Sequence, residues 1–361
     1  MTLHINGRFL TQRLSGVQRV AHALLSALAE REDRPTGDIL VPRGVARTEP
    51  PSTVWPVAEV GPFHGQLWEQ TGLPKAAAGA PLLNLCNLAP LAHSANILMI
   101  HDTSVFDQPE GYGWRFRTWY RAILPILGRR ARRVLTISRF SADRLVALGI
   151  APAETVRIVP NGVDHLLRIA PNPAVLDRHG LSAGGYALVV GSSNPNKNVP
   201  AAIQAVAAAG VPGLQVAIVG TTPLRRVFDG ATHSGTPGDA DPTVIEVGAI
   251  DDGGLRALYE NAACLVFPSL YEGFGLPPLE AMTLGCPVVA SNRTSLPEVC
   301  GEAAILIDPD DRAALAGAVR RVVTDIGLRD EMIARGRYRA AVYTWARAAG
   351  NLREVLAEAG V

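Results

Sequence analysis

The sequence predicts an α/β protein made of two doubly wound, Rossmann-like domains. Short apolar runs alternate with longer stretches of helical spacing through most of the 361 residues. This alternation is typical of parallel sheets whose two faces are covered by helices. The pattern occurs twice, with a break near Val163–Ala183 that contains prolines and glycines typical of a linker. The length also suits two domains better than one core.

The expected strands are short runs rich in Val, Ile and Leu, the composition of strands buried on both faces. In chain order these runs are Leu3–Asn6, Ile39–Val41, Leu82–Leu85, Ile97–Ile100, Val134–Ile137, Ala187–Val190, Val216–Val219, Val244–Val247, Cys264–Phe267, Val288–Ala290 and Ile305–Ile307. Stretches with helical spacing lie at Gly16–Ala29, Phe140–Leu148, Val199–Ala209, Gly254–Ala263 and Asp311–Val323. These elements place a first domain at residues 1–165 and a second at residues 166–340.

Composition narrows the class of protein. Hydrophobic residues make up 48% and charged residues 19% of the chain, which indicates a globular protein. No apolar run reaches the roughly 18–20 residues that cross a bilayer. The segment Met1–Arg8 lacks the regions of a signal peptide, so we expect a cytoplasmic protein.

Charge is unevenly distributed along the chain. The formal net charge is +1, but residues 1–170 carry 19 Lys/Arg against 13 Asp/Glu, whereas residues 171–361 carry 15 against 20. This asymmetry indicates that one half faces something anionic. The excess is too small to indicate a nucleic-acid partner.

The sequence predicts no metal site and no cofactor. The four cysteines are far apart and lack CxxC spacing, so we expect free thiols; they are Cys86, Cys264, Cys286 and Cys300. No DxD-type acidic cluster follows a strand in a way that would hold a divalent cation. We expect Asp308–Asp311 to form a turn and a helix cap instead.

The most specific motif runs from Glu272 to Glu280, directly after the expected strand Cys264–Phe267. Its two glycines permit a sharp turn and a close approach of a ligand to the backbone. Its two prolines suit the start of a helix, and we expect Glu280 in the first turn. Free amides and the helix dipole at such a start favour an anion such as a phosphate.

These residues resemble the retaining family 4 glycosyltransferases. The resemblance continues through most of the chain: His101–Asp102, Ser138–Ser141, Ile158–Asp164, Val190–Asn198, Gly248–Tyr259, Gly285–Ser291 and Leu296–Val299. It implies the GT-B fold, in which two domains face a cleft and a last helix, here residues 341–361, crosses back to the first domain. It also implies a nucleoside-diphosphate sugar donor, an acceptor held by the first domain, and retention of anomeric configuration.

The resemblance implies roles for both carboxylates of the motif. In the family the first Glu contacts the donor sugar and the second holds the ribose hydroxyls, so these roles pass to Glu272 and Glu280. The backbone between them would meet the sugar hydroxyls and the diphosphate. The further donor-binding residues that the resemblance implies are Val247, Gly273, Phe274, Gly275 and Leu276.

Lys197 follows a strand and a glycine turn and opens a helix, so we expect it to meet the charge that builds on the leaving diphosphate. A solvated surface lysine is the alternative. Many family members have an arginine where this chain has Ser192, a position that we include among the donor-binding residues. Arg225 and Arg226 are candidate substitutes, although solvated surface charge is the favoured interpretation for that pair.

Two positions in the first half match signatures of the family. Gly16 would let the backbone approach the reacting sugar or the phosphates, and a plain helix-entry glycine is the alternative. His101 follows an expected strand and, when neutral, would hydrogen-bond a hydroxyl of the donor sugar. Asp102 would either orient His101 or cap the next segment.

The segment Trp114–Arg133 holds seven arginines and four aromatic residues. Such a helix suits an anionic membrane surface or a lipid-pyrophosphate acceptor, which would make the protein peripheral on the inner face of the plasma membrane. A surface helix whose aromatic rings pack inward is the equal alternative.

The leading hypothesis is a metal-independent hexosyltransferase of surface-polysaccharide assembly. Its acceptor would be a glycan or a lipid-linked glycan, and mannose from GDP-mannose is the favoured donor because the motifs are similar to those of O-antigen and exopolysaccharide enzymes. A UDP-sugar donor on the same fold is one alternative. A catalytically weak subunit that binds a nucleotide sugar is another, since the usual arginine is missing.

Overall fold

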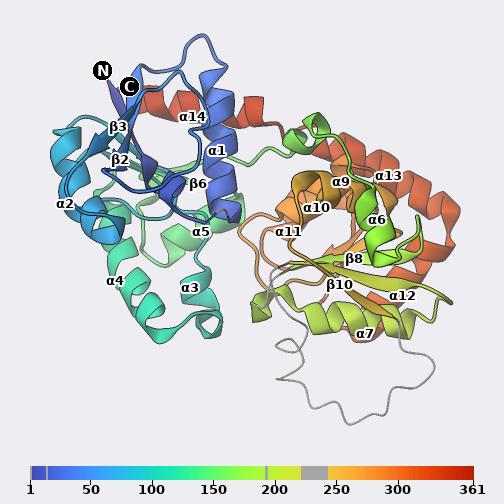
Figure 1. Ribbon diagram of the computed structural model, residues 1–361. Coiled ribbons are helices and arrows are strands. Elements are labelled where there is room, and N and C mark those ends of the chain that lie inside the picture. Colours follow the sequence, from blue (N-terminus) through green and yellow to red (C-terminus); the bar gives the residue numbers. More distant parts are fainter. Residues whose placement is uncertain (1, 14, 192–193, 221–242) are drawn as a thin grey trace. The chain divides into compact units, whose positions relative to one another are not determined.

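The computed structural model describes residues 2–13, 15–191, 194–220 and 243–361 (Figure 1). The chain folds into two compact units. Unit 1 comprises Met1–Gly162 and Thr344–Val361, and unit 2 comprises Val163–Tyr343. Each unit has its own parallel sheet with helices on both faces, which is the doubly wound α/β architecture that the sequence predicts.

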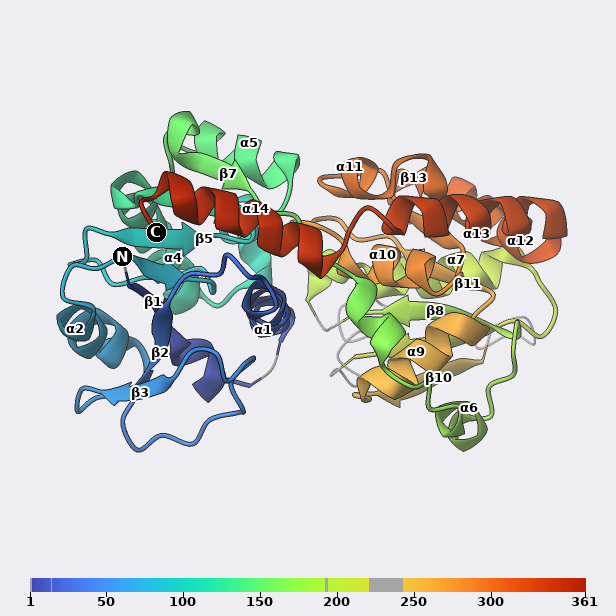
Figure 2. The same cartoon turned by 90° about the horizontal axis from the view of Figure 1, so that it is seen from above.

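Unit 1 is built on a seven-stranded parallel sheet with the order β3-β2-β1-β4-β5-β6-β7. Its strands are β1 (Leu3–Asn6), β2 (Gly37–Pro42), β3 (Val57–Val60), β4 (Leu82–Asn84), β5 (Asn96–Met99), β6 (Arg133–Thr136) and β7 (Val156–Ile158). Its helices are α1 (Gly16–Ala29), α2 (Gly65–Ala77), α3 (Ser104–Asp107), α4 (Trp114–Arg130), α5 (Arg139–Ala147) and α14 (Trp345–Glu358). The last helix, α14, packs against α1 (Figure 2).

Unit 2 is built on a six-stranded parallel sheet with the order β10-β9-β8-β11-β12-β13. Its strands are β8 (Tyr186–Val190), β9 (Gln215–Val219), β10 (Val244–Gly248), β11 (Cys264–Phe267), β12 (Val288–Ser291) and β13 (Ile305–Ile307). Its helices are α6 (Ala174–His179), α7 (Val199–Ala209), α9 (Asp252–Asn261), α10 (Leu276–Thr283), α11 (Leu296–Cys300), α12 (Arg312–Thr324) and α13 (Ile326–Ala340).

Each sheet has a point where the strand order reverses. In unit 1 the chain runs outward from β1 to β2 and β3, and then returns to place β4 on the other side of β1. In unit 2 the same reversal separates β8 from β11. In open parallel sheets ligands bind beyond the carboxyl ends of the strands at such a switch point. The two reversals therefore mark where a site is expected in each unit.

Apolar side chains hold the helices on these sheets. In unit 2 a buried cluster joins α7 and α12 to β8 and β9, with Val206 and Val319 from the two helices both at most 2% exposed. In unit 1 a second cluster joins α4 to β5 and β6 through Leu124 and Leu127. Asp311 caps α12 by accepting a hydrogen bond from the Ala314 amide at 2.9 Å, as the sequence predicts.

Two helices begin and end at the predicted residues, α1 and α7, and the expected strand runs all coincide with observed strands to within two residues. The sequence did not predict β3, β7 or α2. The edge strand β3 is only partly buried and includes Glu59, so it lacks the continuous apolar pattern of the inner strands. Helix α2 contains Pro74 and has little amphipathic character, which hides its helical period.

Candidate active site

The loops after β8 and β11 carry two predicted site residues, Lys197 and Glu272, and these loops lie at the switch point of unit 2. The Lys197 Nζ atom donates a hydrogen bond to Glu272 Oε1 at 2.6 Å, although 75 residues separate them in the sequence. Nζ also lies 5.5 Å from the centroid of the Phe267 ring, within range of a cation–π contact. Both side chains keep some exposure, 27% for Lys197 and 12% for Glu272, so a ligand has access to them.

Backbone hydrogen bonds hold these two loops together. The Leu270 amide donates to the Asn196 carbonyl at 2.7 Å, and the Asn198 side chain donates to the Pro268 carbonyl at 3.3 Å. The Lys197 loop itself is tightened by the Asn194 side chain, which accepts from the Asn196 amide. These bonds fix the backbone of the two loops from which the Lys197 and Glu272 side chains meet.

Two residues after β12, Thr294 and Ser295, form hydrogen bonds with the backbone of the glycine turn. The Glu272 amide donates to Thr294 Oγ1 at 3.1 Å. The Ser295 hydroxyl is fully buried and lies 2.9 Å from the Glu272 carbonyl and 2.8 Å from the Phe274 carbonyl, so it donates between them. Neither residue was predicted from sequence, because their contact to the turn depends on the neighbouring positions of β11 and β12 in the sheet.

Gly275 explains why the turn requires glycine. Its φ is +109°, and a Cβ there would lie 2.7 Å from Leu296 Cδ2. It stands just before α10, which begins at Leu276 and has proline in its first turn. The Phe274 ring is 4% exposed and packs edge-on against Tyr343 at a centroid distance of 5.7 Å. The segment therefore offers a ligand its backbone rather than its aromatic ring.

Glu280 lies in the second turn of α10 and not in the first, because the helix begins at Leu276. This corrects the position predicted from sequence. Its side chain is 6% exposed, and the Tyr259 hydroxyl from α9 donates to Glu280 Oε2 at 3.0 Å. Burial and the neighbouring carboxylate both raise the pKa of Tyr259, so that hydroxyl keeps its proton. His165 Nε2 lies 3.9 Å from the other carboxylate oxygen.

His101 follows β5 in unit 1 and is 4% exposed. Its Nε2 atom lies 2.8 Å from the Leu85 carbonyl, and a carbonyl only accepts, so Nε2 carries the hydrogen. Burial, foremost, lowers the pKa of His101, so the ring is neutral near pH 7 and Nδ1 is an acceptor. Asp102 accepts from the Ser104 amide at 2.8 Å and caps the next segment, while Leu85 orients the ring.

The remaining predicted donor-binding positions have simpler surroundings. Gly16 is the first residue of α1, and the space where its Cβ would stand is open. Val247 lies near the carboxyl end of β10 and is 8% exposed, and Gly248 is the last residue of that strand. Ser192, Arg225 and Arg226 lie outside the described residues.

Neither a metal-binding cluster nor a membrane-spanning helix occurs in the part of the chain that the structure describes. Within residues 2–13, 15–191, 194–220 and 243–361, no three His, Cys, Asp or Glu side chains gather as a metal-binding group would require. The four cysteines are free thiols. None of the described helices combines the length and apolar character needed to cross a bilayer.

Two family models together match most of the chain. The model of Glycosyltransferase Family 4 matches residues 14–165, and the model of Glycosyl transferases group 1 matches residues 184–325.

Two curated relatives come from Escherichia coli. The chain is 33% identical over 268 residues to O-antigen chain mannosyltransferase B, which covers 69% of this chain and 66% of that protein. It is 29% identical over 234 residues to the serotype-specific mannosyltransferase WbdA, which covers 63% of this chain and 28% of WbdA. The chain thus spans just under two thirds of the first relative and little more than a quarter of the second.

Solved structures match the fold over nearly the whole chain. Sucrose-phosphate synthase from Thermosynechococcus elongatus has a TM-score of 0.73 at 21% identity, with 99% of this chain and 98% of that chain covered. HepE from Anabaena, solved in complex with UDP-glucose, has a TM-score of 0.71 at 17% identity, with 99% of each chain covered. At this level of identity the likeness concerns the fold alone, which is the GT-B arrangement of two Rossmann-like units.

Proposed function

This chain belongs to the family 4 glycosyltransferases, and on that premise we propose that it transfers mannose from GDP-mannose to a glycan or glycolipid acceptor with retention of anomeric configuration. The similarity to two mannosyltransferases, one of them named for the O-antigen chain, supports the sugar and a role in surface-polysaccharide assembly. We further propose that the predicted domain 166–340, which lies in unit 2, binds the donor. The predicted domain 1–165 would bind the acceptor, the helix at 341–361 would cross back to it, and the protein would be cytoplasmic.

The contact between Lys197 and Glu272 carries the proposal. Each of the two charges compensates the other at the switch point. When the donor binds, the ammonium is placed for the diphosphate and the carboxylate for the hydroxyls of the sugar. Charges held in place before the reaction stabilise a developing charge without further reorganisation. Lys197 therefore neutralises the diphosphate as the glycosidic bond breaks.

Backbone groups complete the donor site in this proposal. The first amides of α10 have no partner within the helix and, with the helix dipole, favour the diphosphate. The turn at Gly273–Gly275 brings them close because no side chain intervenes. Glu280 accepts from the ribose hydroxyls while Tyr259 holds its carboxylate, and Val247 lies beside the base. Positive charge from Lys197 and from α10 takes the place of a metal ion.

His101 is proposed to contact the transferred sugar. Because Nε2 donates to Leu85, only Nδ1 is left for a ligand, and it accepts from a sugar hydroxyl. No protein group is assigned as general base: the leaving phosphate takes the proton of the acceptor hydroxyl on the same face of the sugar. The configuration is retained because the acceptor hydroxyl attacks from the same face of the sugar that the phosphate leaves.

A thermal-shift screen of nucleotide sugars tests the proposal. GDP-mannose at roughly 100 times its Kd is expected to stabilise the protein by about 2.7 kcal/mol, because it binds only the folded state. UDP-glucose and UDP-galactose at the same concentration are expected to give a much smaller shift, and EDTA is expected to change neither result. Stabilisation by UDP-sugars alone would overturn the GDP-mannose assignment, and no stabilisation by any nucleotide diphosphate would overturn the donor site.

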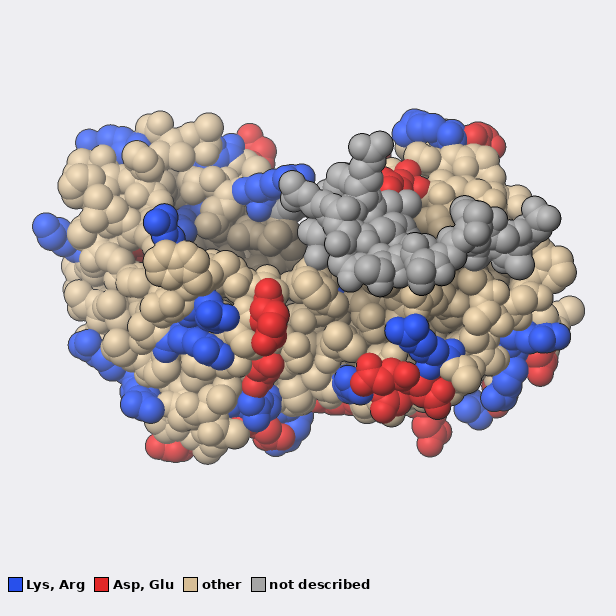
Figure 3. Space-filling view, turned by 90° about the horizontal axis from the view of Figure 1, so that it is seen from below, with Lys and Arg blue, Asp and Glu red and all other residues tan. Residues whose placement is uncertain are grey.

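The helix α4 supports a proposal for the acceptor side, namely that it contacts an anionic membrane surface. Trp114, Phe116 and Trp119 are 67%, 43% and 39% exposed, so part of each ring is available to a membrane surface. Tyr120 packs on the core of unit 1, and Phe116 stacks on it at a centroid distance of 4.1 Å. Arg115 and Arg117 lie among them. On the face shown in Figure 3, Lys and Arg side chains lie in several separate groups, unlike a stripe that follows a nucleic-acid backbone.

Liposome flotation tests the membrane contact. The protein is expected to float with vesicles containing anionic lipid and to remain behind with neutral vesicles, because both ring insertion and charge attraction contribute. Replacing Trp114 and Trp119 by Ala, or Arg115 and Arg117 by Ala, is expected to abolish flotation. Tyr338→Ala removes an aromatic side chain that is 83% exposed in unit 2 and serves as the control. Unchanged flotation of both double variants would contradict the proposal.

A further inference from the structure

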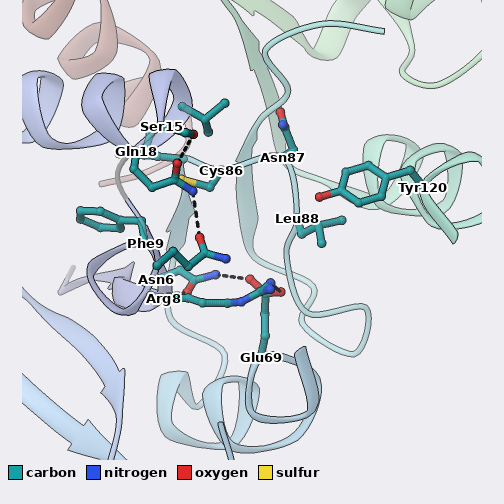
Figure 4. A pocket seen from close by; sticks show the side chains of 13 residues that line it. Asn6, Arg8, Phe9, Ser15, Gln18, Glu69, Cys86, Asn87, Leu88 and Tyr120 are labelled. Carbon is teal, nitrogen blue, oxygen red and sulfur yellow. Dashed lines mark hydrogen bonds and ion pairs between the residues drawn. The ribbon is translucent and has the colours of Figure 1, made fainter. Parts of the chain in front are cut away.

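Unit 1 contains a cavity of about 190 Å³ at the switch point of its sheet, beyond the carboxyl ends of β1 and β4 (Figure 4). The volume far exceeds the space that one water needs and is smaller than a pocket for a drug-sized ligand. One wall comes from the segment that leads from β1 into α1, and the other from residues Leu85–Leu88 after β4. The cavity therefore lies where an open parallel sheet binds its ligand.

A buried ion pair forms part of the cavity wall. Arg8 Nη1 donates to Glu69 Oε2 at 2.6 Å, and Asn6 Nδ2 donates to Glu69 Oε1 at 2.8 Å. Glu69 is 2% exposed and Asn6 is 7% exposed. A carboxylate accepts about four hydrogen bonds and a guanidinium donates five, so this pair offers both acceptors and donors to a ligand. Buried ion pairs contribute little net stability, so stability alone does not account for a pair at this position.

The charges at this cavity balance. Arg8 and Glu69 cancel one another, and the other titratable side chains on the wall are neutral at pH 7. Burial raises the pKa of the Tyr120 hydroxyl and that of the Cys86 thiol, each to about 12. A phosphate would meet a carboxylate without a surplus of positive charge, which disfavours it. The wall therefore favours a neutral ligand that both donates and accepts hydrogen bonds.

Apolar side chains also line the cavity, namely Val17, Leu85 and Leu88, and Figure 4 shows the Tyr120 hydroxyl directed into the space. A pyranose ring likewise has both kinds of surface, since hydroxyl groups surround a face of C–H bonds. The Leu85–Leu88 segment also contacts His101: the His101 amide donates to Asn87 Oδ1 at 2.8 Å, and Leu85 holds the ring.

We infer that this cavity binds one neutral sugar ring, the terminal residue of the acceptor, and that Arg8, Glu69 and Tyr120 grip its hydroxyls. The identification of this sugar as the acceptor rests on the proposed function, whereas the binding of a neutral sugar rests on the cavity alone. The ion pair distinguishes hydroxyl pairs by position, because a diol bridges the carboxylate and the guanidinium only when its two oxygens are adjacent. The specificity for the acceptor sugar is therefore assigned to Arg8 and Glu69.

Saturation-transfer NMR on the full chain tests the inference, with methyl α-mannopyranoside as the neutral probe and mannose 6-phosphate as the charged one. The neutral probe is expected to bind at millimolar concentration and more tightly than the charged one. Tyr120→Phe removes one neutral hydrogen bond and should weaken binding up to about tenfold, and Glu69→Gln removes a charged partner and should weaken it at least about tenfold. Tyr338→Phe, on the exposed surface of unit 2, should bind like the wild type.

Three results would overturn the inference: no binding of the neutral probe, tighter binding of the phosphorylated probe, or wild-type binding in Tyr120→Phe. The Tyr120→Phe variant keeps the aromatic ring, so it is expected to fold even if Glu69→Gln does not. Thermal shift with GDP-mannose is measured on every variant, because the contacts proposed for the nucleotide lie in unit 2. Loss of probe binding with donor stabilisation intact supports the cavity. Absence of donor stabilisation together with specific probe binding would instead overturn the proposed function and leave the sugar site standing.

Discussion

Replacing Glu272 by Ala is expected to lower the transfer rate at saturating substrates by about 10²–10³-fold or more, with the fold intact. The substitution removes the carboxylate proposed for the donor sugar, and it leaves the Lys197 ammonium without the partner 2.6 Å away. Removal of one preorganised polar group at a reacting centre typically costs this much. The measurement is the rate of release of the nucleoside diphosphate with a saturating donor, and circular dichroism checks the fold.

Matched variants separate the role of the site from the loss of an ion pair. Glu331→Ala breaks a pair of the same length, 2.6 Å, between Glu331 and Arg335 on the exposed side of α13, and it should leave the rate unchanged. Glu272→Gln and Lys197→Met are each expected to lower the rate strongly, and the double variant should be little worse than either, because groups that act as a unit are not additive. A normal rate in Glu272→Ala would refute the assignment.

Replacing Glu280 by Ala is expected to weaken donor binding by about ten- to a hundredfold, with a much smaller change in the rate at saturating donor. The carboxylate is proposed to accept from the ribose, which lies away from the bond that breaks. A hydrogen bond to a charged group contributes about 1.5–3 kcal/mol, which corresponds to this loss of affinity. The measurements are the Kd of GDP by calorimetry and the KM of the donor.

The structure supplies a control that distinguishes a ligand contact from a structural one. In Glu280→Ala the Tyr259 hydroxyl stays buried without the carboxylate that lies 3.0 Å away in the wild type, which costs about 1–3 kcal/mol of stability. Adding Tyr259→Phe removes that hydroxyl and should restore much of the stability, but it should not restore the affinity for GDP. If the double variant recovers donor binding, Glu280 acts only by holding the fold.

Local patterns account for much of the fold. Helices α1 and α7 and the buried strands follow from apolar periodicity, because each of them buries most of one face or both faces. Elements with a weak pattern were not predicted, namely the partly exposed edge strand β3 and the proline-containing helix α2. The start of α10 shows the limit of such patterns: the prolines predicted a helix start, but the helix begins at Leu276, so Glu280 lies in the second turn and not in the predicted first turn.

At the candidate site, local patterns predicted the residues whose chemistry is local: a glycine turn, a helix start and two carboxylates between Glu272 and Glu280. What these residues contact depends on the fold. Lys197 reaches Glu272 because β8 and β11 are neighbours, Tyr259 reaches Glu280 because α9 packs beside α10, and Arg8 after β1 reaches Glu69 on α2. Periodicity reports which face of an element is buried, whereas these contacts depend on the order of strands in a sheet. That order is set by packing between segments tens of residues apart, so no local spacing records it.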